Sequence, residues 1–91
     1  MNELETYRDE ISEIDRQMAG LFEKRMQVCA KIGAFKKAAG LPVRDRKREN
    51  TLLTANSAYI TDPAVAPHYV TFQKSVMDIS CTYQESILSG L

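Results

Sequence analysis

The chain has 91 residues, with 12 basic and 12 acidic side chains and a formal net charge of zero at pH 7. This length corresponds to one small domain, residues 1–91, and the balanced charge disfavours nucleic acid or an acidic membrane surface as the partner. No apolar run could span a bilayer, and the N-terminus lacks the basic-then-apolar order of a signal peptide. Cys29 and Cys81 fit no metal or redox spacing, so we expect two free, reduced cysteines in a cytoplasmic protein.

The first predicted element is one long helix from Leu4 to about Ala39, because apolar residues recur there every three or four positions. The sequence Gly40-Leu41-Pro42 ends it, since a glycine followed by a proline is typical of a helix C-terminus. We call its apolar line the seam. The seam consists of Leu4, Tyr7, Ile11, Ile14, Met18, Leu21, Val28, Ile32 and Phe35, with Arg25 in place of one apolar residue.

The length of this helix predicts a dimer. At about 1.5 Å per residue it is roughly 54 Å long, whereas a compact chain of this size is roughly 30 Å across. The seam therefore extends past anything that its own chain could pack around it. A second copy of the same helix, related by a two-fold axis, is the simplest partner to cover it.

A second, shorter helix is predicted to begin near Asp45, which is a candidate N-cap, and to end around Asn56-Ser57. Thr61-Asp62-Pro63 then predicts the start of a third helix, as a cap followed by a first-turn proline. No alternating β pattern is present, so the sequence predicts an all-α fold with one long, one short and one medium helix. The third helix is expected to place four apolar residues on one face, Tyr69, Phe72, Val76 and Met77.

Polar residues interrupt the apolar face of every predicted helix. Arg25 is a permanent cation that is costly to bury unpaired, so we expect an anion to meet it. Lys36 lies eleven residues further on, close to three helical turns, and therefore shares the face of Arg25. The second helix presents Asp45, Arg48 and Glu49 together with Leu52, and the third presents Ser80 and Gln84.

Two interpretations of these residues stay open at this point. They can satisfy one another, for example by an Arg25–Glu49 ion pair and by a hydrogen bond from Ser80 to its own helix. Alternatively they line a pocket for an anion, which the excess of cations favours for the set as a whole. The sequence contains no Ser-His-Asp set, metal cluster or glycine-rich phosphate loop, and His68 is expected at the surface.

The ordered set of these residues resembles the all-α (type II) chorismate mutases, and the resemblance covers nearly the whole chain. It is carried by Tyr7-Arg8-Asp9-Glu10-Ile11, Ile14-Asp15, Arg25, Ile32-Gly33 with Lys36, Pro42-Val43-Arg44-Asp45, Arg48-Glu49, Ser80 and Gln84.

The resemblance implies an intertwined helical homodimer that rearranges chorismate to prephenate, on the route to phenylalanine and tyrosine, with no cofactor or metal. It implies that Arg25 and the partner subunit's Arg8 bind the two substrate carboxylates. Lys36 and Gln84 would donate hydrogen bonds to the ether oxygen, and Lys36 would also touch a carboxylate. The remaining implied roles are those of Glu49, which accepts from the ring hydroxyl, of Asp45 close by, and of Arg48 and Ser80, which support the carboxylate and hydroxyl ends.

The stretch before the third helix is one residue shorter than the family pattern, so the register of that helix has to be chosen. We place Ser80 and Gln84 in the site, rather than Ile79 and Tyr83, because Ser80 and Gln84 continue the face of Val76. Two other functions remain as alternatives: an isochorismate-pyruvate lyase of the same fold, and a non-catalytic helical dimerisation or regulatory module. In the latter, the inward polar residues would form mutual ion pairs and leave no cavity.

Overall fold

The computed structural model of the chain describes residues 2–90, so the first and last residues of the predicted domain lie outside it. It contains three helices, α1 (Glu3–Ala39), α2 (Arg46–Ser57) and α3 (Ala66–Leu88). The described residues form no strand, and the predicted all-α fold with one long, one short and one medium helix is confirmed. Between residues 2 and 90, no helix has the length and apolar character that crossing a membrane requires.

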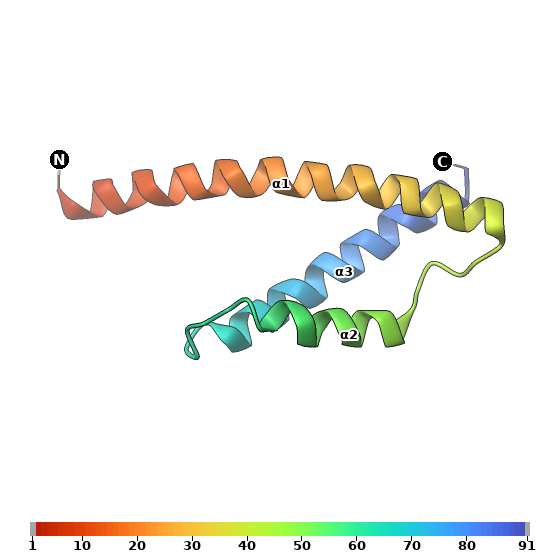
Figure 1. The fold of residues 1–91 in the computed structure, drawn as a ribbon. Helices are drawn as coiled ribbons and strands as arrows, with labels where there is room; N and C mark the ends of the chain where they lie inside the picture. The colour runs from red at the N-terminus through yellow and green to blue at the C-terminus, as the bar shows by residue number, and fades with distance from the viewer. Residues whose placement is uncertain (1, 91) are drawn as a thin grey trace.

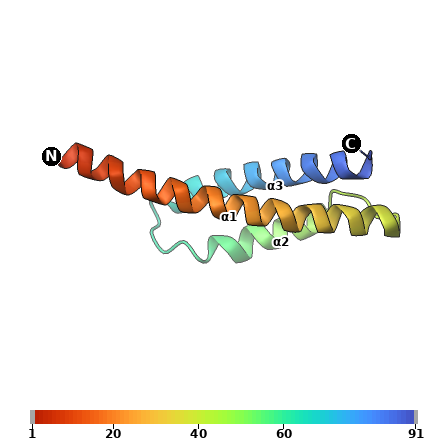
Figure 2. The ribbon, with the colours of Figure 1, turned by 90° about the horizontal axis from the view of Figure 1, so that it is seen from above.

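The helices form two layers, with α1 above and with α2 and α3 side by side below it (Figures 1 and 2). α3 packs against both α1 and α2, and runs obliquely beneath the C-terminal half of α1. The N-terminal half of α1 extends past the ends of the other two helices (Figure 1). The chain measures 55 × 28 × 14 Å and has a radius of gyration of 16.5 Å, well above the ~12 Å of a compact chain of this length.

Local capping chemistry defines the two ends of α1. At the N-terminus, the Asn2 side chain accepts a hydrogen bond from the Glu5 amide at 2.9 Å, which satisfies one of the free amides of the first turn. At the C-terminus, Gly40 adopts the left-handed conformation with φ of 69°. The Leu41 amide then donates to the Lys36 carbonyl at 2.9 Å, so the helix ends at the glycine as predicted.

α2 begins as the sequence predicts, and α3 does not. Asp45 caps α2, because its carboxylate accepts a hydrogen bond from the Arg48 amide at 3.0 Å. The predicted start of α3 at Pro63 is wrong, since the helix begins at Ala66 and Asp62 caps only a turn that precedes it. Pro67 explains the difference: within a helix running from Pro63 it would lack the amide for the Pro63 carbonyl and would clash with it.

The small core forms where α3 crosses α1. α3 buries a row of four residues with 4-3-4 spacing, of which three are polar: Gln73, Met77, Ser80 and Gln84. α1 contributes Cys29 and Gly33 to the same contact. The prediction that Phe72 lies on the buried face of α3 is therefore wrong. Phe72 is 47% exposed, and the buried row lies beside it.

Gly33 allows the two helices to approach closely. A Cβ atom at this position would lie 3.4 Å from the Gln84 Cα and 3.4 Å from the Ile87 Cβ. A larger side chain would push α3 away from α1 and would move Gln84 with it. Gly33, which costs helix propensity, thus contributes to the placement of a predicted site residue.

Candidate active site

A cavity of about 680 Å³ lies between the C-terminal half of α1, the connection to α2, α2 itself and α3. Seven of the eight predicted site residues line it: Arg25, Lys36, Asp45, Arg48, Glu49, Ser80 and Gln84. The eighth, Arg8, is exposed on the N-terminal half of α1 and is not part of the lining. α3 turns Ser80 and Gln84 toward the cavity, whereas Ile79 and Tyr83 are 46% and 39% exposed.

Arg25 is half-buried and is held by neutral groups. Its guanidinium donates hydrogen bonds to the Ser80 hydroxyl and, at 3.7 Å, to the Cys29 sulfur. Ser80 in turn donates to the Val76 carbonyl at 2.7 Å, which is the predicted hydrogen bond to its own helix. The Arg25–Glu49 ion pair that the sequence left open does not form. Among residues 2–90, no carboxylate lies within 4.0 Å of Arg25. The charge of Arg25 therefore stays available to an anion.

Lys36 and Gln84 meet across the contact between α1 and α3. The Lys36 ammonium donates to the Gln84 side-chain carbonyl at 3.1 Å and to the Val43 backbone carbonyl at 2.6 Å. An ammonium has only donors, so it must face the oxygen of the amide. This leaves the Gln84 NH₂ group as the donor that is free for a ligand. Two hydrogen-bond donors, one charged and one neutral, thus converge at this end of the cavity.

Glu49 is the more shielded of the two carboxylates of the site, with its side chain 14% exposed. Its Oε1 accepts a hydrogen bond from Arg44 at 2.7 Å, and Arg46 lies 3.8 Å from the same oxygen. Its Oε2 is buried and has no hydrogen-bond partner in the described part of the chain. Arg44 also donates to Asp78 at 2.7 Å, and this hydrogen bond raises the pKa of the Arg44 guanidinium.

Asp45, the N-cap residue, and Arg48, in the first turn, line the cavity from the start of α2. Both are exposed, and the carboxylate of Asp45 is engaged in capping the helix. Arg48 has no carboxylate within 4.0 Å in the described residues. Together with Leu52, they share one helix face with Glu49, as the i, i+3, i+4, i+7 spacing predicts.

The lining of the cavity has an excess of positive charge. Five cationic side chains and two carboxylates surround it, so an anionic ligand of small size suits it. Cys29 and Cys81 also line it and are both free. Burial raises the pKa of the Cys81 thiol, so this group stays neutral. Within residues 2–90, no three His, Cys, Asp or Glu side chains are grouped to hold a metal ion.

Sequence reasoning did not assign roles to three residues that shape the site. These are Gly33, at the close contact of the helices, Arg44, which joins Glu49 to Asp78, and Gln73, in the buried row of α3. Only the 4-3-4 spacing from Gln73 through Met77 to Ser80 and Gln84 gives a signal for the last of them. For Gly33 and Arg44 the sequence gives no such signal, because the contacts of both residues depend on how the helices cross.

The fold and the site define the class of protein: a small all-α domain with a cation-rich cavity between its helices. Comparison with known families matches residues 7–85 to chorismate mutase type II, and the chain belongs to this family. It is 36% identical over 55 residues to the T-protein of Haemophilus influenzae, an alignment that covers 60% of this chain. The alignment spans 15% of the length of that relative. No solved structure gives a significant match.

Proposed function

We propose that this chain, as a single domain of residues 1–91, catalyses the rearrangement of chorismate to prephenate. One observation carries the proposal: residues from all three helices that match the family pattern surround one cavity, and within residues 2–90 its cations Arg25, Lys36 and Arg48 have no carboxylate partner. Chorismate carries two carboxylates, which suit such a cavity. A non-catalytic module would instead have mutual ion pairs and no cavity, and the observed arrangement argues against it.

The residue types suit a unimolecular Claisen rearrangement, in which no group of the enzyme has to attack the substrate. The enzyme has to hold a flexible dianion in its folded, reactive conformer. In our proposal Arg25 and Arg48 bind substrate carboxylates from the cavity wall, with Ser80 holding the guanidinium of Arg25 in place. Fixing the arginine in advance reduces the ordering that substrate binding must impose.

The second requirement is to stabilise negative charge on the ether oxygen as the C–O bond breaks. We assign this to the Lys36 ammonium and to the free NH₂ group of Gln84. The two side chains lie together because the ammonium donates to the Gln84 side-chain oxygen at 3.1 Å. Glu49 accepts the ring hydroxyl through its unpartnered Oε2, with Asp45 close by at the start of α2. Each reacting or orienting group of chorismate then has one counterpart in the cavity.

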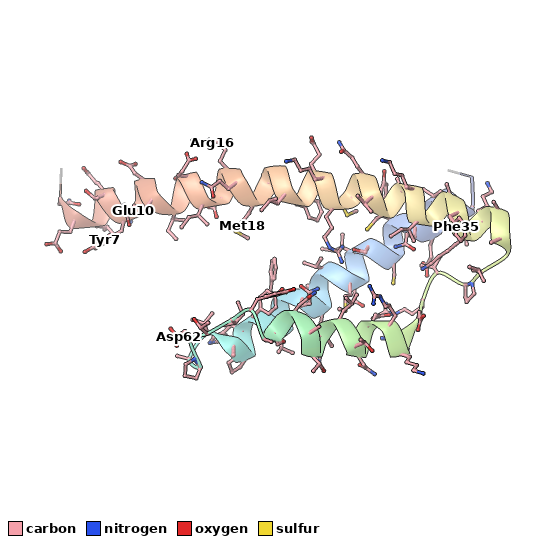
Figure 3. All side chains as sticks on the ribbon, viewed as in Figure 1. Tyr7, Glu10, Arg16, Met18, Phe35 and Asp62 are labelled. Carbon is pink, nitrogen blue, oxygen red and sulfur yellow. The ribbon has the colours of Figure 1, made fainter. Side chains whose placement is uncertain are left out.

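We further propose that the active enzyme is a cytoplasmic homodimer, in which the partner's Arg8 completes each site. The exposed seam supports the dimer: Ile11 and Leu21 are 57% and 64% exposed, and Figure 3 shows Tyr7 and Met18 on one side of α1 with Arg16 on the opposite side. In an antiparallel dimer, the N-terminal half of one α1 approaches the cavity of the other copy. The two free cysteines support a reducing compartment.

One assay tests the proposal. The purified protein is incubated separately with chorismate and with isochorismate, and substrate loss, prephenate and pyruvate are measured. We expect prephenate from chorismate and no pyruvate release. Pyruvate from isochorismate without prephenate formation would instead identify a lyase, and no turnover of either compound would overturn the proposed function.

A further inference from the structure

Arg44 is the residue of the α1–α2 connection that joins the site to both shorter helices. One of its guanidinium nitrogens, Nη2, lies 2.7 Å from the Glu49 Oε1 of α2 and 2.7 Å from the Asp78 Oδ1 of α3. The Arg44 and Glu49 side chains are 30% and 14% exposed, whereas Asp78 is 65% exposed. The contact with Glu49 is therefore the more shielded of the two, and the contact with Asp78 fixes Arg44 from the solvent side.

The contact leaves the two oxygens of Glu49 in different states. Oε1 accepts from Arg44, while Oε2 is buried without a hydrogen-bond partner in the described residues. A buried acceptor that no donor satisfies is costly, so its presence points to a donor that arrives with a ligand. An arginine–carboxylate hydrogen bond is charge-assisted and strongly directional, which restrains how the carboxylate can rotate.

Arg44 and Glu49 also separate two cavities. Both residues line the site cavity and a neighbouring cavity of about 340 Å³ that reaches Lys74 and Asp78. Removal of the guanidinium would join the two spaces and admit water to Glu49. Water would then compete with a ligand for the free carboxylate oxygen.

We propose that Arg44 is a positioning residue of this enzyme: it holds the Glu49 carboxylate through Oε1, so that Oε2 is presented to the ring hydroxyl of the substrate. The inference rests on the proposed mutase function and deepens it, because that proposal assigns the substrate carboxylates and the ether oxygen to other residues and gives Arg44 no role. Asp78 acts one step further out, as the anchor that keeps Arg44 in place.

The test is a double-mutant cycle on Arg44 and Glu49, with kcat and KM for chorismate measured for each variant. Arg44→Ala should lower kcat/KM by about tenfold to a hundredfold, the scale expected when a catalytic group loses its alignment. Arg44→Lys should regain part of the loss, since an ammonium can reach one carboxylate but not hold both. In a Glu49→Gln background, Arg44→Ala should lower kcat/KM by a further factor of less than about three. The carboxylate that Arg44 positions is already absent in that background.

Controls separate positioning from folding. Lys47→Ala, on the exposed surface of α2, should leave kcat/KM unchanged, and thermal unfolding should show that each variant is folded. If Arg44→Ala does not fold, Arg44→Gln, which keeps a hydrogen-bond donor, takes its place in the cycle. Wild-type activity in the Arg44 variant, or equal losses in the two backgrounds, would overturn the positioning role alone. Absence of chorismate turnover by the wild-type protein would overturn the mutase function and this inference with it.

Discussion

The two halves of α1 differ in what surrounds them. Residues 3–24 are exposed throughout, so their seam residues face solvent in the single chain. Residues 25–39 pack on α3 through the buried Cys29 and Gly33, and of the seam positions Arg25 reaches Ser80 of α3. The seam stays open in this half as well, since Phe35 is 67% exposed.

This difference shows that α1 has two contact faces with separate tasks. A face of small residues lets α3 approach closely and places the polar groups of the cavity. The seam, made of large apolar residues, stays exposed in the single chain, and we propose that another chain covers it. Its exposure over the whole helix is more than a stable monomer usually tolerates, which is why we assign it to a second copy. The comparison predicts that mutations will separate into those that affect assembly and those that affect chemistry.

The largest expected effect comes from a charge on the free half of the seam. Ile11→Asp should raise the dimer dissociation constant at least ~100-fold, because the single two-fold interface loses two symmetry-related isoleucine side chains, each worth about 1.5–3 kcal/mol when buried. Activity should fall with it, since each site would lose the partner's Arg8. Analytical ultracentrifugation against concentration measures the dissociation, with Ser12→Asp, on the adjacent exposed position, as the matched control. An Ile11→Asp protein that stays dimeric would remove the seam from the interface.

The packed half should show the opposite result with Lys36→Ala. Loss of the charged donor to the ether oxygen should cost about 3 kcal/mol, or at least about a hundredfold in kcat/KM, while the dimer persists. Steady-state kinetics and sedimentation together test this expectation. Lys31→Ala, an exposed lysine of the same helix half, should retain full activity. Near-normal turnover by Lys36→Ala would contradict the assigned role.

Mixed dimers join the two halves in one experiment. Arg8→Ala and Arg25→Ala should each be inactive as homodimers, since each lacks one carboxylate ligand in both sites. Unfolding and refolding a 1:1 mixture should restore about a quarter of wild-type activity, because half of the dimers are mixed and each holds one intact site. No recovery above the separate variants would show that Arg8 does not act across the interface.

Glycines in the two halves should respond differently to alanine. Gly20 lies off the seam in the exposed half, and a Cβ atom at this position would have no heavy atom within 4 Å. Gly20→Ala should therefore raise the free energy of unfolding by about 0.5–1 kcal/mol. Gly33→Ala should gain less, because its methyl group would meet the backbone of α3 at 3.4 Å. Urea unfolding of both variants checks the difference, and equal gains would mean that the α1–α3 contact is looser than described.

The smallest effect concerns the wall of the cavity. Burial raises the pKa of the Cys81 thiol in the folded chain, whereas the unfolded thiol ionises near pH 8.5. The associated stability is present below that pH and is lost as the pH rises toward the folded-state value. The free energy of unfolding should therefore fall slightly less between pH 8 and 10 in Cys81→Ala than in wild type, with Cys29→Ala as the comparison, because the substitution removes the thiol whose ionisation favours the unfolded chain. Parallel profiles would show that water reaches Cys81 freely.

Sequence reasoning was most successful where the signals are local. The end of α1 at Gly40 and the cap of α2 at Asp45 follow from residues within one turn of each boundary. It failed at the start of α3, because Asp62-Pro63 is a good start signal and Pro67, four residues later, overrides it. The helical spacing of the polar residues also predicted which of them could share a pocket, since residues on one helix face stay together whatever the helix packs against.

What the sequence determined by itself was therefore the list of elements, the bounds of α1 and α2 and the polar residues on each face, all of which depend on short-range periodicity and capping. Tertiary structure alone decided which face of α1 receives α3, why Gly33 is needed there, and that Arg44 rather than Arg25 pairs with Glu49. These features depend on how the helices cross and on which long side chains can then reach one another. The physical reason is that helix faces are set by neighbours three and four residues apart, whereas crossing contacts join residues far apart in the chain.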